Sequence, residues 1–532
     1  MNEATRMTQT ASTEEVRAAL IARREIALLD LREEDPFAQA HPLWAANLPL
    51  SRLELEAWGR IPRRDTPIVV YDDGEGLVAP ALERLRALGY TDVKALEGGL
   101  AGWREAGGEL FRDVNVPSKS FGELVESRRH TPSLSAQEVQ GLLEAGSDVV
   151  VLDARRFDEY QTMNIPGSTS VPGGELVLRA RELAPDPATL VIVNCAGRTR
   201  SIIGTQSLVN AALPNPVAAL RNGTIGWTLA GQALEHGAQR RFGPALRPAH
   251  AEAARDAAGD VARRAGVEVI DAATLARWQA ETGRTTYAFD VRTPEEYAAG
   301  HRPGFRGAPG GQLVQETDVH APVRGARLVL SDEGDGVRAP MTASWLAQMG
   351  WDVAVLEAPP AGALETGPDS APQPAPPAVR GVSPATLADW LATGDTVLVD
   401  VTASASYVRR HIPGARFAVR SQLPALLPQL GAPRRLVLTC GSSLLARFAA
   451  DDIAGLTSSD VFVLEGGTAA WVAAGLPVEA GETALLSARI DRYRRPYEGT
   501  DNAAAAMQAY LDWEFGLVEQ LGRDGTHHFF VV

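Results

Sequence analysis

One sequence pattern occurs four times along this chain, and it constrains the fold more than any other feature. Each copy opens with a short apolar strand that ends in aspartate: Asp30, Asp153, Asp290 and Asp400. A second apolar strand follows, and the residue after it lies 42 positions beyond the aspartate in three copies and 40 in the fourth. A turn leading to a tryptophan comes next in copies one, two and four. Such regular spacing indicates four duplicated units, called repeats below.

Within each repeat, short apolar strands alternate with amphipathic segments such as SIIGTQSLVNAAL. Strands of four to six residues without polar alternation are buried on both faces, so helices must cover them. The sequence therefore predicts an α/β fold with four tandem domains, each a small, mostly parallel sheet covered by helices on both faces.

The expected domains span residues 12–115, 130–245, 264–362 and 380–482. Residues 361–381 are rich in proline and alanine and predict a semi-rigid linker. Residues 483–532 lie outside the repeats and predict a helical extension with Tyr510, Trp513 and Phe515 on one side, packed across a domain interface.

Composition narrows the possible partners and location. The net charge of −15 repels phosphate backbones, so nucleic acid is not expected as a partner. No apolar run approaches the length of a membrane span, and the N-terminus has no apolar signal core, so we expect no membrane association. The two cysteines, Cys195 and Cys440, are too far apart in sequence for a CxxC pair, and a reducing cytoplasm is the expected location.

Cys195 ends the second strand of the second repeat, within LVIVNCAGRTRS. A strand, a tight loop and a helix beginning near Ser201 direct backbone N–H groups at the sulfur, and these groups and the helix dipole favour the thiolate. Arg198 and Arg200 can bind an oxyanion through their forked donors. These residues predict a nucleophilic cysteine that attacks an anionic sulfur donor.

The second repeat resembles the rhodanese family of sulfurtransferases in DARRFDEY, NIPG, CAGRTRS and the downstream GW, and the resemblance extends over residues 12–482 as four rhodanese-like domains. It implies that Cys195 takes a sulfane sulfur from a small anionic donor, most simply thiosulfate, and holds it as a persulfide. It also implies transfer to cyanide or a thiol, with a protein persulfide as a further possible donor or acceptor and no cofactor. The substrate contacts it implies are Ala196, Gly197, Arg198, Thr199, Arg200 and Ser201.

Cys440 has fewer of these features. Its sequence, CGSSLLARFAA, places no arginine before Arg447, although CGS resembles the start of the loop in mercaptopyruvate sulfurtransferases. The sequence slightly favours a vestigial loop over a second catalytic cysteine, and 3-mercaptopyruvate stays open as a donor. Asp153 and Arg155 are expected to support the second repeat by joining its first strand to the cysteine loop.

In the first and third repeats, aspartate replaces the nucleophile. Asp72 in YDDGEG and Asp332 in SDEGDG cannot form a persulfide, so these two repeats are expected to be inactive. Neither turn has EF-hand spacing, so helix capping is expected and no metal is. Bacterial two-domain rhodaneses are similar, and they predict that each inactive repeat packs beside the active repeat that follows it.

Two other classes of protein share parts of this sequence pattern. Cysteine phosphatases and arsenate reductases have five residues between cysteine and arginine, whereas four separate Cys195 from Arg200, and the shorter loop favours sulfur transfer. A non-catalytic persulfide carrier or scaffold is the second alternative, because two of the repeats lack cysteine. The physiological donor and acceptor, and the oligomeric state, stay open.

Overall fold

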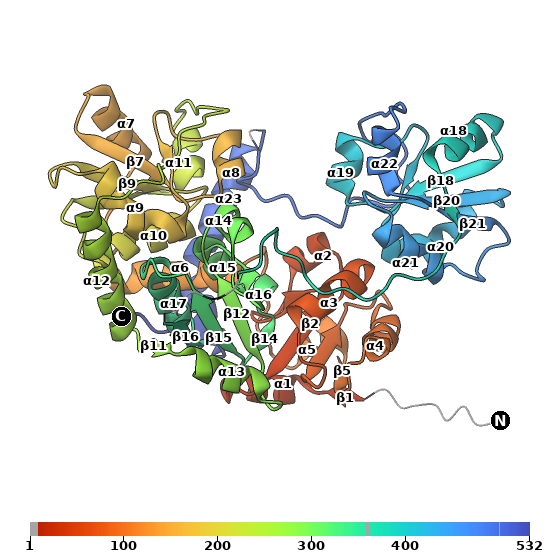
Figure 1. Ribbon diagram of the computed structural model, residues 1–532, viewed down its shortest axis with the longest axis horizontal. Coiled ribbons are helices and arrows are strands. Elements are labelled where there is room, and N and C mark those ends of the chain that lie inside the picture. Colours follow the sequence, from red (N-terminus) through yellow and green to blue (C-terminus); the bar gives the residue numbers. More distant parts are fainter. Residues whose placement is uncertain (1–8, 358–361, 363, 500) are drawn as a thin grey trace.

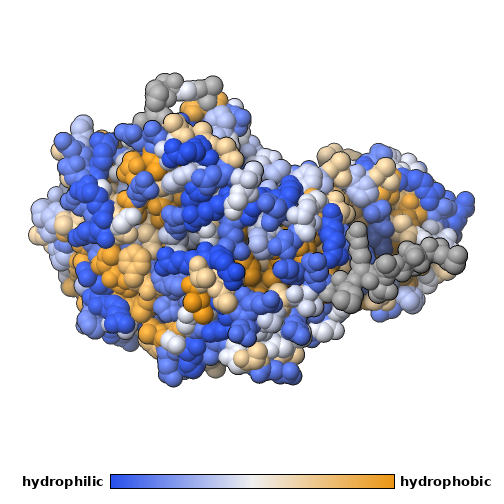
Figure 2. Space-filling view, turned by 90° about the horizontal axis from the view of Figure 1, so that it is seen from below, coloured by the Kyte–Doolittle hydropathy of each residue, from blue (hydrophilic) through white to orange (hydrophobic). Residues whose placement is uncertain are grey.

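The computed structural model describes residues 9–357, 362, 364–499 and 501–532. Two positions of the expected 361–381 linker, 361 and 363, lie outside the described residues, as does the start of the N-terminal segment. In the described part, no helix is long and apolar enough to cross a membrane. Figure 2 shows a face that is mostly hydrophilic, with hydrophobic residues in separate patches.

Four sheets with one shared strand order make up the structure, which confirms the predicted α/β class. The first sheet contains β1 (Thr10–Ala11), β2 (Ile26–Asp30), β3 (Ala46–Asn47), β4 (Ile68–Tyr71) and β5 (Val93–Leu96). The second contains β6 (Ser133–Leu134), β7 (Val149–Asp153), β8 (Thr169–Ser170), β9 (Leu190–Asn194) and β10 (Val217–Leu220). The third contains β11 (Glu268–Ile270), β12 (Thr286–Asp290), β13 (Arg306–Gly307), β15 (Arg327–Ser331) and β16 (Asp352–Leu356). The fourth contains β17 (Gly381–Val382), β18 (Thr396–Asp400), β19 (Arg416–Phe417), β20 (Arg435–Thr439) and β21 (Asp460–Leu464).

Strand pairing within each of these five-strand sets is parallel, and a single antiparallel strand joins from another repeat. This strand is β14 (Val323–Arg324) of the third repeat, which extends the first sheet by pairing with β2. The first and third repeats therefore share one sheet, a connection that the repeat pattern did not predict.

Helices cover both faces of the second sheet. The helices of this repeat are α7 (Ala136–Glu144), α8 (Phe157–Thr162), η2 (Gly173–Glu175), α9 (Leu176–Leu183), α10 (Thr199–Asn210) and α11 (Gly223–Leu229). Leu152 and Val193 pack in one core with α9 and α10, whereas Val151 and Ile192 pack in another with α7 and α11. Because successive side chains of a strand point to opposite faces, the uninterrupted apolar runs fill both cores.

The helices of the other repeats follow the same order, except that among the described residues the third repeat has no counterpart of α11. The first has α1 (Thr13–Ile21), α2 (Glu34–Gln39), η1 (Leu50–Arg52), α3 (Leu53–Arg60), α4 (Val78–Ala87) and α5 (Gly99–Glu105). The third has α13 (Ala272–Ala280), α14 (Pro294–Ala299), α15 (Gly310–Gln315), α16 (Thr317–His320) and α17 (Arg338–Gln348). The fourth has α18 (Pro384–Thr393), α19 (Ser404–Arg409), η3 (Arg420–Gln422), α20 (Leu423–Leu426), η4 (Leu427–Leu430), α21 (Leu444–Asp452) and α22 (Gly467–Ala473).

Four further helices connect or follow the repeats. They are α6 (Val116–Arg129), α12 (Pro248–Arg264), α23 (Ala504–Phe515) and α24 (Leu517–Asp524). Figure 1 shows the first three repeats in one body, with the fourth standing to one side. The chain then returns from the fourth repeat to this body, where α23 contacts α6 and α11.

The second repeat packs against the third, and the first against the fourth, through elements at equivalent positions. The prediction that each inactive repeat packs beside the active repeat that follows it in the chain was therefore wrong. The segment η2 contacts α15 and α17, and Arg338 donates to Glu175 over 2.8 Å. In the other pair, η1 contacts η3, and Arg420 donates to both carboxylate oxygens of Glu54 at 2.7 and 2.9 Å. A buried arginine from the later repeat thus meets a buried glutamate from the earlier one in both pairs.

Candidate active site

Cys195 lies in a closed turn between β9 and α10. Its side chain is buried, and its thiol donates a hydrogen bond to Ser201 Oγ at 3.4 Å. Ser201 Oγ in turn donates to the carbonyl of Arg198, across the loop. The sequence prediction that Cys195 is at a strand-to-helix junction is thus met by the local structure, and the first residue of α10 is Thr199.

Gly223, in the turn that follows β10, packs closely against the backbone of the Cys195 loop. Gly223 begins α11 with a positive φ of 54°, and a methyl group there would lie 2.3 Å from the carbonyl oxygen of Cys195. Thr224 N donates to the same oxygen at 2.9 Å. Gly99 and Gly467 approach the carbonyls of Asp72 and Cys440 in the same way. The glycine of the recurring turn before tryptophan is therefore fixed by close backbone approach.

Burial determines the resting state of the sulfur. It raises the pKa of the Cys195 thiol, and the charge of Arg200 and the hydrogen bonds from Ser201 oppose this increase only in part. The sequence led us to expect that the loop would favour the thiolate. In this structure the cost of desolvating a thiolate outweighs those favourable contacts, so the thiol form of Cys195 is favoured.

Both loop arginines are paired with carboxylates. Arg198 donates to Glu123 at 2.7 and 2.9 Å, and it also pairs with Glu126. Arg200 forms two parallel bonds with Glu159, at 2.8 and 2.9 Å. Burial alone would raise the pKa of Glu159, but Arg200 lowers it to about 2. An anionic donor that binds Arg200 must therefore share the guanidinium with an ionised carboxylate or displace it.

The predicted support residues join the two central strands. Asp153 accepts from Nε and Nη2 of Arg155 at 2.9 and 2.7 Å, and Arg155 also donates to the carbonyl of Met163. Asn194, directly before the cysteine, donates to Asp153 at 2.9 Å. This buried network connects the end of β7 to the end of β9 and so fixes where the cysteine loop begins.

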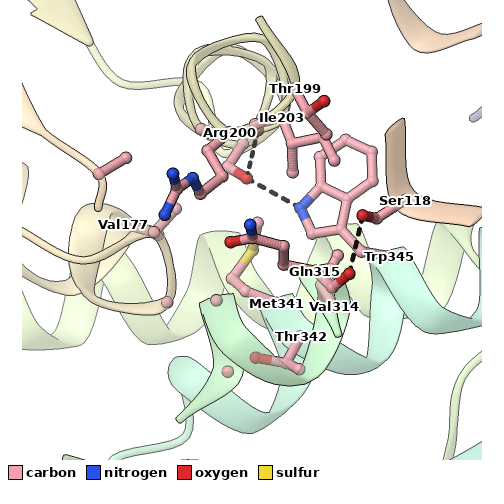
Figure 3. Close-up of a pocket in the computed structure, with 17 residues that line it drawn as sticks. Ser118, Val177, Thr199, Arg200, Ile203, Val314, Gln315, Met341, Thr342 and Trp345 are labelled. Carbon is pink, nitrogen blue, oxygen red and sulfur yellow. Dashed lines mark hydrogen bonds between the residues drawn. The ribbon is translucent and has the colours of Figure 1, made fainter. Parts of the chain in front are cut away.

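The third repeat approaches the cysteine loop from the side of Arg200. A cavity of about 40 Å³ lies where α10 meets α15 and α17. Figure 3 shows Arg200 and Ile203 of α10 on one side of it and Gln315, Met341 and Trp345 on the other. Trp345 Nε1 donates to Ser207 Oγ at 2.8 Å, which ties the third repeat to α10.

The C-terminal extension covers the loop, an arrangement that the sequence did not reveal. A methyl group on Gly197 would lie 3.2 Å from the ring of Tyr510 and 3.5 Å from the carboxylate of Glu514. Tyr510 donates to Glu514 at 2.8 Å, and burial raises the pKa of Glu514 to about 8. Lys119 lies over the Tyr510 ring at 5.1 Å and pairs with Asp113. Only the rarity of lysine in this arginine-rich sequence could have drawn attention to Lys119.

In the first and third repeats the aspartate itself occupies the loop. Asp72 accepts from the backbone of Gly74 at 3.2 Å and from that of Leu77 at 2.6 Å. Asp332 makes the equivalent bonds to Gly334 and Val337, both at 3.1 Å. These N–H donors, which would face a substrate anion or a persulfide, are already bound to a carboxylate of the chain.

Cys440 lies in a similar turn and is also buried, but among the described residues a methyl group on Gly441 would meet no heavy atom within 4 Å. Ser443, with a φ of 78°, precedes α21, and the sulfur faces backbone N–H groups of Ala446 and Ser442. Burial raises the pKa of this thiol despite these donors. A cavity of about 480 Å³ adjoins the loop at Gly441, and Arg409 and Arg410 line it. The fold thus brings two arginines to a cavity beside the Cys440 loop, although the loop sequence itself has none.

The repeated sheets correspond to a domain that is known from other proteins. The family model described as "Rhodanese-like domain" matches residues 12–106, 135–230 and 383–474. The chain belongs to the rhodanese family. The third repeat lies outside the matched ranges, yet its sheet has the strand order of the other three. The predicted family membership is thereby confirmed.

One solved rhodanese is similar to this chain over almost its full length. It is the crystal structure of a thiosulfate sulfurtransferase from Pseudomonas aeruginosa, with 68% identity and a TM-score of 0.97, covering 98% of this chain and 100% of that one. A curated relative from Mycobacterium tuberculosis (strain H37Rv), named "Putative thiosulfate sulfurtransferase SseB", is 32% identical over 132 residues. That match covers 22% of this chain and 43% of the relative, less than half of its length. YqhL of Bacillus subtilis is 35% identical over 98 residues, which cover 18% of this chain and 74% of that protein.

Proposed function

We propose that this chain is a sulfurtransferase that moves a sulfane sulfur from thiosulfate to cyanide or a thiol through a persulfide on Cys195. The observation that carries the proposal is the Cys195 loop, in a chain 68% identical to the thiosulfate sulfurtransferase of P. aeruginosa. Ala196, Gly197, Thr199 and Ser201 complete the proposed substrate-binding loop with the two arginines. Asp72 and Asp332 leave the first and third repeats without a nucleophile.

The proposed reaction has two steps. Cys195 loses its proton to solvent, and the thiolate attacks the outer sulfur of thiosulfate, so that the S–S bond of the donor breaks and sulfite leaves. The acceptor, cyanide or a thiolate, then attacks the outer sulfur of the persulfide and restores the Cys195 thiolate. Because burial raises the pKa of Cys195, little of the sulfur is thiolate at neutral pH, and persulfide formation is expected to speed up as the pH rises.

The cover over the loop favours a small donor and acceptor. Tyr510 and Glu514 lie against Gly197, and the Cys195 side chain is buried beneath them. A small anion needs less displacement of this cover than a partner protein, which would have to displace α23. This contact supports a thiosulfate-type enzyme over a carrier that exchanges persulfide between proteins.

The test compares wild type with Cys195→Ser and Cys440→Ser. After thiosulfate treatment we expect intact mass spectrometry to find one added sulfur atom in wild type and Cys440→Ser, and none in Cys195→Ser. Thiocyanate formation from cyanide should follow the same pattern. Activity that survives Cys195→Ser and disappears in Cys440→Ser would move the site to the fourth repeat, and no adduct on either cysteine would reject thiosulfate as the donor.

A further inference from the structure

The fourth repeat contains a buried carboxylate that lacks the partner present in the other three. In those repeats an arginine two residues after the strand-ending aspartate binds both of its oxygens, as Arg155 does with Asp153. Thr402 stands at this position in the fourth repeat, and its backbone N–H donates to Oδ1 of Asp400 at 2.9 Å. Oδ2 of Asp400 is buried and has no hydrogen-bond partner among the described residues. A buried carboxylate oxygen without a partner is costly and calls for an explanation.

A cavity adjoins the position of the missing side chain. In the other repeats the arginine also donates to a backbone carbonyl eight residues further on, at Ala40, Met163 and Gly300. The equivalent residue in the fourth repeat is Arg410. Asp400, Thr402 and Arg410 all line the cavity of about 480 Å³ that adjoins Gly441 of the Cys440 loop.

We propose that this cavity binds a small zwitterionic molecule whose guanidinium or primary ammonium group pairs with Asp400, in the place that an arginine side chain fills in the other repeats. The exposed Arg409 and Arg410 line the same cavity and suit an acidic group at the other end of the molecule. A ligand held this way lies against the Cys440 loop, so this is a binding site of the fourth repeat and separate from Cys195.

The charge of Asp400 makes binding depend on pH. Burial raises its pKa to about 7, against the Thr402 N–H and the nearby His411, which favour the ionised form. Cys440 and Tyr407 also interact with Asp400, and both are neutral at pH 7 because burial raises the pKa of each, whereas Arg409 and Arg410 line the same cavity as permanent cations. The carboxylate therefore gains its charge, and with it affinity for a cation, as the pH rises through 7.

The experiment measures binding to the full-length protein by isothermal titration calorimetry at pH 8. The probes are ethylguanidinium, its uncharged analogue ethylurea, and 4-guanidinobutyrate, which adds a carboxylate. We expect one site for ethylguanidinium, none for ethylurea, and tighter binding of 4-guanidinobutyrate. At pH 6 the affinity for ethylguanidinium should fall about tenfold, because the ionised fraction of a group with a pKa of about 7 falls from about nine-tenths to about one-tenth.

Two variants assign the site. Thr402→Arg restores the residue that the other repeats carry, so it should fold normally and lose ethylguanidinium binding, and Asp400→Asn should lose it as well. Binding that persists in Thr402→Arg, or equal binding of ethylurea, would overturn the assignment to Asp400, and so would no saturable binding in wild type. If 4-guanidinobutyrate bound no tighter than ethylguanidinium, the zwitterionic ligand class would be wrong. Repeating the titration in Cys195→Ser, where binding should persist, separates this site from sulfur transfer.

Discussion

Gly223→Ala should disable the Cys195 loop while leaving the rest of the fold intact. The new methyl group would lie 2.3 Å from the Cys195 carbonyl oxygen and 2.7 Å from that of Gly197, so the loop must move. Alanine at a positive φ costs about 1–2 kcal/mol, and relieving such an overlap typically costs a further ~1–3 kcal/mol. Because the strain falls on the loop that holds the sulfur, we expect persulfide formation to slow at least about tenfold, which corresponds to about 1.4 kcal/mol.

Gly231→Ala is the matched control. Gly231 has a φ of 76°, and a methyl group there would meet no heavy atom within 4 Å. This variant carries the same kind of backbone cost without the overlap. The assay is a single turnover with thiosulfate, quenched and analysed by intact mass, beside thermal unfolding of both variants. If Gly223→Ala formed the persulfide as fast as Gly231→Ala, the glycine would not be needed to shape the loop, and the reasoning would be refuted.

Two further predictions concern buried charges. Arg155→Met leaves Asp153 buried without its cation and should lower the free energy of unfolding in urea by about 3–5 kcal/mol. Arg156→Met is the control, because this side chain is half-exposed and its loss should lower that free energy little. Equal urea midpoints for the two variants would contradict the support role of Arg155. Burial raises the pKa of Glu514 from 4.5 to about 8, so the folded chain keeps a proton that the unfolded chain loses in this window, and stability falls as the pH rises through it. Glu514→Gln removes this loss, so its melting temperature relative to wild type should be higher at pH 8.5 than at pH 5; a difference that does not change with pH would show that Glu514 is already ionised when folded.

Much of the fold can be predicted from local patterns in the sequence. Uninterrupted apolar strands such as VVVLD and LVIVN predict parallel sheets buried on both faces, because no solvated face requires polar residues. The sequence also predicts that Asp153 and Arg155 join the first strand to the cysteine loop, and β7 and β9 are paired in the sheet. These features depend on residues close together in sequence or on duplication, and both can be recognised without coordinates.

Tertiary structure alone decided how the repeats meet and what surrounds each cysteine. The partners of Arg198 and Arg200, namely Glu123, Glu126 and Glu159, lie in other segments of the chain, and Glu514 comes from more than 300 residues away. Whether an arginine is free to bind an anion depends on such distant carboxylates, and whether a thiol ionises depends on its burial. Sequence proximity could therefore place the proposed nucleophile after its strand, but the charge and solvation around it arise only when remote segments pack together.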